Sequence, residues 1–102
     1  MQTNLNTVII TKMAPEDIDG VIKIEESAYG DHHWSKESFL NEINNELAKY
    51  YTLKTPEGEL AGYAGTWHIL EEAHITTIAI APQFRRRKYG EALLKRIIDD
   101  CY

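Results

Sequence analysis

The run HITTIAIA, residues 74–81, restricts the possible folds more than any other part of the chain. It is almost wholly β-branched or apolar, which is typical of a strand covered on both faces. Such a strand needs secondary structure packed on either side of its sheet. The run therefore predicts an α/β domain in which helices flank a sheet.

Two segments of alternating character precede this strand and predict an antiparallel hairpin. KYYTLK and ELAGYAGTW follow a period of two, and Pro56, Glu57 and Gly58 between them are turn-forming residues. A further short strand is expected at residues 7–11, with the β-branched sequence TVIIT.

Three helices are predicted around these strands, which gives the order β-α-α-β-β-β-α. The first begins at Pro15 and ends near Gly30, the second is capped by Ser35, and the third begins at about Tyr89. The apolar residues expected to face the core are Ile18, Val21, Ile22 and Ala28 in the first helix, Phe39, Ile43 and Leu47 in the second, and Leu93, Leu94, Ile97, Ile98 and Cys101 in the third.

The length of 102 residues and the apolar content of 43% suit a single domain over residues 1–102. The one cysteine excludes an internal disulfide, and His32 and His33 beside Asp31 offer no third ligand, so no metal site is expected. The sequence has neither the pattern of a signal peptide nor an apolar run near the roughly 18 residues of a membrane span. A cytoplasmic protein without a membrane partner is expected.

A basic run stands at the expected start of the last helix, in a chain whose first 84 residues carry a net charge of −8. Cations there oppose the positive end of the helix dipole and repel one another. The run could be a solvated surface, a nucleic-acid patch or the rim of a phosphate cradle. Its members are Arg85, Arg86, Arg87 and Lys88.

The phosphate cradle is favoured over the other two interpretations. Backbone N–H groups at a helix N-terminus bind anions, and Gly90 allows close approach of a phosphate. No aromatic residues interleave the cations, and the rest of the chain repels polyanions, so no nucleic-acid partner is expected.

The run HITTIAIAPQFRRRKYGEALL resembles the acetyl-CoA-binding segment of the GCN5-related N-acetyltransferases (GNAT). The family motif is Arg or Gln, two residues, Gly, one residue, then Gly or Ala. It matches here from Arg85 to Gly90, with Lys88 in place of the first glycine. DIDGVIKIEESAYGDHHWSKESF, GELAGYAGTW and EEAHITTIAIAPQFRRR are most similar to the RimI-type ribosomal-protein-alanine N-acetyltransferases.

This resemblance implies an enzyme that transfers an acetyl group from acetyl-CoA to a protein N-terminal amine, for example that of a ribosomal protein. The alternatives are a CoA-binding module without catalysis and an acetyltransferase acting on a small-molecule amine. The resemblance also implies the N-terminal part of a GNAT fold, with a mixed, mostly antiparallel sheet, and a cofactor cleft completed by segments beyond Tyr102. The 74–81 strand would then be an exposed edge, for which self-association is expected.

The resemblance also assigns roles to the cofactor-binding segment. The backbone of Ile78, Ala79 and Ile80 would pair with the pantetheine arm as a strand would. The pyrophosphate would lie at the turn and helix start, formed by Arg85, Arg86, Arg87, Lys88, Tyr89, Gly90 and Glu91.

Candidate catalytic and acceptor residues lie before this segment. His74 stands where some family members place a general base, and Glu71 and Glu72 could orient it or act directly. The alternative for His74 is a structural hydrogen bond at a strand edge. Asp31 and Trp34 fall in the loop that lines the acceptor groove of the family, although Trp34 could instead anchor the second helix.

Overall fold

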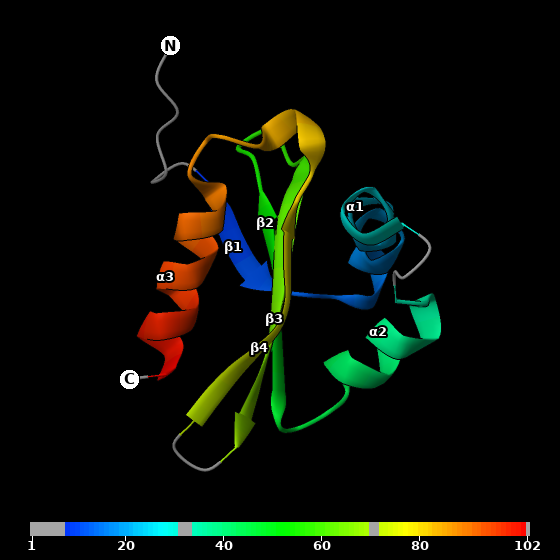
Figure 1. Ribbon diagram of the computed structural model, residues 1–102, viewed down its shortest axis with the longest axis vertical. Helices are drawn as coiled ribbons and strands as arrows, with labels where there is room; N and C mark the ends of the chain where they lie inside the picture. The colour runs from blue at the N-terminus through cyan, green and yellow to red at the C-terminus, as the bar shows by residue number, and fades with distance from the viewer. Residues whose placement is uncertain (1–7, 31–33, 70–71, 102) are drawn as a thin grey trace.

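The computed structural model describes residues 8–30, 34–69 and 72–101 (Figure 1). It confirms the predicted order of elements. These are β1 (Ile9–Lys12), α1 (Ile18–Tyr29), α2 (Lys36–Ile43), β2 (Ala48–Lys54), β3 (Leu60–Ile69), β4 (Glu72–Ile80) and α3 (Tyr89–Cys101), with 3-10 turns η2 (Pro15–Asp17) before α1 and η4 (Pro82–Phe84) before α3.

The four strands form one antiparallel sheet in the order β1-β2-β3-β4. Helices α1 and α2 cover one face and α3 covers the other (Figure 1). The predicted α/β class with flanking helices is therefore confirmed. Within the described residues, β4 is an edge strand, and no helix is long and apolar enough to cross a membrane.

The predicted end of the first helix and the predicted start of the second are confirmed. The Ser35 hydroxyl accepts the backbone N–H of Ser38 at 3.1 Å and caps α2. Helix α1 ends at Tyr29, and Gly30 follows with a φ of 60°.

The prediction for Leu47 was wrong, because α2 ends at Ile43 and Leu47 is 55% exposed in the connection to β2. Two asparagines account for this end. Asn44 Nδ2 donates to the carbonyl of Leu40 at 3.0 Å, and Asn45 Oδ1 accepts the N–H of Leu47 at 2.9 Å. Such local bonds give the backbone an alternative to further helical turns.

Burial of the apolar positions also differs from prediction on two helices. In α3 the sheet covers the row formed by Leu93 and Ile97, whereas Leu94 and Ile98 are 38% and 56% exposed. The predicted face was too wide, since one row at i, i+4 makes the contact with the sheet. Ala28, in the last turn of α1, is exposed, and the side chain of Cys101 lies outside the described part.

Strand β4 contains a bulge that divides it into two halves. Gly65 pairs with Thr77 and Thr66 pairs with Ile75, so Thr76 is an extra residue in β4. Beyond the bulge, β4 packs between α1 and α3. Residues 72–75 before the bulge are exposed, so the expectation of cover on both faces was wrong for this half, which extends past the helices.

Candidate functional site

The turn between β4 and α3 has a strained backbone. Arg86 and Lys88 have φ values of 66° and 63°, and no other described non-glycine residue has positive φ. A left-handed backbone costs an L residue roughly 1–2 kcal/mol. The strain thus occurs where the phosphate cradle is predicted.

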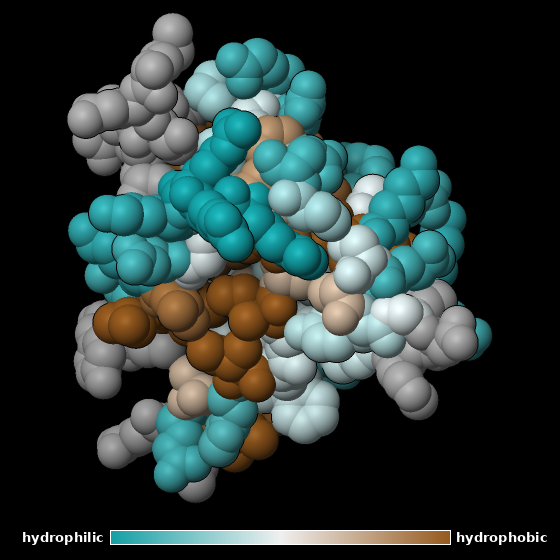
Figure 2. All heavy atoms as spheres, turned by 45° about the horizontal axis from the view of Figure 1, so that its top comes forward, coloured by the Kyte–Doolittle hydropathy of each residue, from teal (hydrophilic) through white to brown (hydrophobic). Residues whose placement is uncertain are grey.

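All four cations of residues 85–88 are exposed, and none forms an ion pair with a described residue. Arg85 Nε donates to the carbonyl of Ile80 at 3.1 Å, and the Arg87 guanidinium lies 5.5 Å from the centre of the Phe84 ring. Figure 2, in which the η4 end of the molecule comes forward, shows a hydrophilic band directly beside an apolar surface. This positive rim is available to an anionic ligand.

Gly90 lies in the first turn of α3, beside this strained turn. A Cβ added to Gly90 would have no neighbouring described atom within 4 Å. The packing of the described residues therefore does not require glycine here, and alanine would favour the helix by up to about 1 kcal/mol. A glycine that leaves open space at a helix start suits the close approach of a ligand.

The outer edge of β4, which faces away from β3, carries backbone groups that point out of the sheet. The carbonyl of Ile78 accepts the Tyr29 hydroxyl at 3.2 Å, and that of Ile80 accepts Arg85. Backbone groups alternate in direction along a strand, so those of Ile78 and Ile80 point away from β3, while those of Ala79, opposite Tyr63, point toward it. Of the three residues predicted to pair with pantetheine, Ile78 and Ile80 thus offer outward groups.

The candidate base His74 lies at the exposed start of β4. Its Nε2 is 3.0 Å from Glu72 Oε2, and the two side chains are 56% and 75% exposed. Glu71 and Asp31 lie outside the described residues. Trp34 packs with its ring centre 5.3 Å from that of Phe39 and 6.3 Å from that of Tyr50, as expected of an anchor for α2.

Tyr50 and Thr76 form a contact that the sequence did not reveal. The Tyr50 hydroxyl is 2.9 Å from Thr76 Oγ1, at the bulge of β4. Burial raises the pKa of Tyr50 to about 12; the Thr76 bond opposes this rise, and the charges of Glu42 and Glu25 add to it. The neutral hydroxyl therefore fixes the bulge next to His74. The two residues are far apart in the chain, and the only sequence signal was Gly65, which makes room for the Tyr50 ring.

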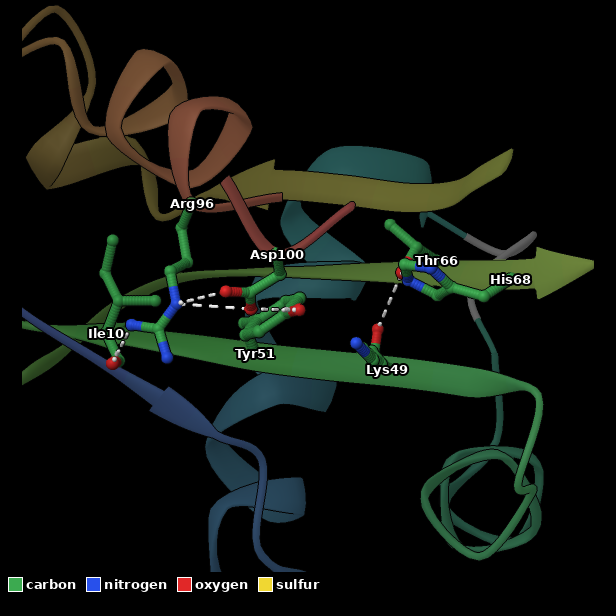
Figure 3. Close-up of polar contacts among 7 residues, drawn as sticks. All are labelled: Ile10, Lys49, Tyr51, Thr66, His68, Arg96 and Asp100. Atoms are coloured by element: carbon green, nitrogen blue, oxygen red, sulfur yellow. Dashed lines mark hydrogen bonds and ion pairs between the residues drawn. The ribbon is translucent and has the colours of Figure 1, made fainter. Parts of the chain in front are cut away.

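A cavity of about 540 Å³ lies between α3, the β1–β2 side of the sheet and the connection from α2 to β2. None of its lining residues belongs to β4 or to the basic turn. The polar network in Figure 3 crosses its wall. Arg96 donates to the carbonyl of Ile10 at 3.0 Å and lies 3.2 Å from Asp100, which also accepts the Tyr51 hydroxyl at 2.7 Å. The hydrogen bond from the Tyr51 hydroxyl lowers the pKa of Asp100, and Arg96 lowers it further. We assign this network to the attachment of α3.

Replacing Lys88 with glycine should stabilise the chain by roughly 0.5 to 1 kcal/mol. Lys88 holds a φ of 63°, which glycine adopts without the Cβ clash, and the greater flexibility of unfolded glycine offsets part of the gain. Urea unfolding of the two chains measures the difference. A control at Lys95, which is exposed within α3, should lose stability on the same change. A loss of stability in Lys88→Gly would contradict the inference that the backbone of Lys88 is strained.

The site thus combines an edge strand with outward backbone groups, a strained turn with exposed cations and the start of a helix, in an antiparallel α/β domain. The sequence model described as the acetyltransferase (GNAT) family matches residues 18–102. The chain belongs to this family, which confirms the family resemblance of its sequence motif.

Two named proteins illustrate the similarity. A Bacillus subtilis (strain 168) protein with the provisional name ribosomal protein bS18-alanine N-acetyltransferase is 37% identical over 92 residues, which cover 90% of this chain and 60% of that protein. The crystal structure of the Escherichia coli ribosomal-protein-S18-alanine N-acetyltransferase superposes with a TM-score of 0.81 at 29% identity, covering 92% of this chain and 59% of that one.

A structure of lower identity shows the same fold. The Thermoplasma acidophilum PaiA N-acetyltransferase, solved in complex with coenzyme A, gives a TM-score of 0.79 at 20% identity over 92% of this chain and 71% of that one. The chain spans about 60% of the length of the bS18-alanine N-acetyltransferases that it matches.

Proposed function

We propose that the chain is the acetyl-CoA-binding part of an N-acetyltransferase that acts on a protein N-terminal amine, such as that of a ribosomal protein. The observation that carries this proposal is the turn before α3, where Arg86 and Lys88 hold left-handed backbone next to an open Gly90. The names of the bS18 relatives support the choice of acceptor.

The residues present suit acetyl-CoA. The N–H groups of the turn and of the α3 start would bind the pyrophosphate, and the exposed cations of residues 85–88 would attract it. The outward backbone groups of Ile78 and Ile80 would bond the amides of the pantetheine arm, as an added strand would. When bound, acetyl-CoA supplies the acetyl group as a reactive thioester.

The acceptor amine must lose a proton before it can attack, and His74 is the proposed base within the described residues. Its Nε2 lies 3.0 Å from a Glu72 oxygen, which would stabilise the imidazolium that forms when His74 takes the proton. Tyr50, through Thr76, keeps the bulge between His74 and Ile78 in place.

Incubation with acetyl-CoA and a short peptide that begins with alanine tests this function. Mass spectrometry should show one acetyl group on the peptide, and chromatography an equal amount of free CoA. A chain that binds CoA in calorimetry but acetylates no amine would support only the coenzyme-binding part of the proposal, as a CoA-binding module would. Acetylation of small amines alone would point to a small-molecule acceptor. Failure to bind acetyl-CoA would contradict the proposal as a whole.

A further inference from the structure

A groove of about 320 Å³ lies between α2 and the far end of β3. We propose that it binds an arginine side chain of the acceptor peptide, a few residues after the amine, an inference that rests on the proposed function. The groove is lined by Trp34, Ser38, Asn41, Glu42 and Trp67.

The groove combines two indole rings with a carboxylate. Trp67 is 39% exposed, and its Nε1 donates to Glu42 Oε2 at 2.7 Å, which holds the carboxylate at the edge of the indole ring. Glu42 forms no ion pair with a described Lys, Arg or His. A cation that enters the groove therefore meets a negative charge and aromatic faces together, an arrangement that attracts cations.

A guanidinium suits these walls better than an ammonium. It is planar, stacks on indole rings, and donates two parallel bonds to a carboxylate, whereas the ammonium of lysine is a compact, strongly hydrated charge. The charge of the chain agrees, because residues 1–84 carry a net charge of −8 and attract a basic peptide.

The groove lies on the acceptor side of the proposed cofactor site. Trp67 stands directly opposite His74 in the β3–β4 pair. Ile78 follows His74 by four positions in β4, a distance of at most about 13 Å because the bulge at Thr76 lies between them. A pantetheine arm that runs from the basic turn along Ile80 and Ile78 brings the thioester toward the bulge. An extended peptide that begins there would place its second to fourth residue at the groove.

Tryptophan fluorescence of the 102-residue chain offers a direct test, since its only two tryptophans, Trp34 and Trp67, both line the groove. The probes are peptides that begin with alanine and carry one arginine at position 2, 3 or 4, each matched by a peptide with neutral citrulline. At one of these positions, we expect the arginine peptide to bind about tenfold more tightly. Equal affinity for every matched pair would overturn the proposal.

The variant Glu42→Gln removes the charge but keeps an oxygen that can accept the Trp67 N–H. We expect it to reduce the arginine preference to less than twofold, whereas Glu46→Gln, an exposed neighbour outside the groove, should keep it. A preference that persists in Glu42→Gln would contradict the assignment.

This binding test is independent of turnover. If alanine peptides are acetylated but arginine and citrulline bind equally, the proposed function stands and the arginine site is wrong. If arginine is preferred but no peptide is acetylated, the groove binds the cation and the enzymatic proposal fails.

Discussion

Replacing Gly65 with alanine should lower the free energy of unfolding by about 3 kcal/mol. A Cβ at this position would clash with the Tyr50 ring. Tyr50 has nowhere to move, because it is 2% exposed, packs edge-on against Phe39 and holds Thr76 through its hydroxyl. Overpacking of a filled core typically costs 1–3 kcal/mol. Urea unfolding followed by circular dichroism measures the loss.

Two further variants make this prediction specific. Gly90→Ala adds the same methyl group where no described atom lies within 4 Å, so it should leave stability equal or higher. Tyr50→Leu removes the ring that the new methyl group would strike, and should restore part of the stability in a Gly65→Ala background. Simple addition of the two losses in the double variant would show that the clash is not the cause.

Replacing Gly90 with leucine should weaken acetyl-CoA binding by about 100-fold, or about 2.7 kcal/mol. The leucine side chain would extend into the open space at the helix start, where the pyrophosphate is proposed to bind. The same change should leave the free energy of unfolding equal or raise it, since leucine favours a helix more than glycine does. Calorimetric titration with acetyl-CoA measures the affinity.

The informative result is a loss of acetyl-CoA affinity without a loss of folding stability. Lys95→Leu, an exposed position farther along α3, should change the affinity less than about threefold. If Gly90→Leu unfolds the chain, the glycine has a structural role that the open space around it does not suggest. If the variant is stable and binds acetyl-CoA as before, the pyrophosphate does not lie at this turn.

Local sequence signals predicted the order of elements correctly, because each strand and helix here has its own pattern and ends. Ser35 caps α2 as expected, and Gly58 lies in the hairpin turn with a φ of 89°. Errors arose where a tertiary contact or side-chain bond decided the outcome. Asn44 ends α2 before Leu47, and the width of the α3 contact depends on the sheet surface.

The candidate site was partly accessible from sequence. The motif located the basic turn, but only the backbone shows that Lys88, which stands in place of the family glycine, has a positive φ. The sequence also could not show which backbone groups of β4 point out of the sheet. The register with β3 decides that those of Ile78 point outward and those of Ala79 inward. The contact of Trp67 with Glu42 joins segments 25 residues apart and follows from no local pattern.

Amide chemical-shift mapping with acetyl-CoA on the isotope-labelled 102-residue chain locates the coenzyme directly. We predict the largest shifts at the amides of Ile78, Ile80 and residues 86–90, on both sides of η4. Shifts centred instead on Lys12, Lys49 and Arg96, which line the larger cavity, would contradict this prediction. An unchanged spectrum at saturating acetyl-CoA would contradict it as well.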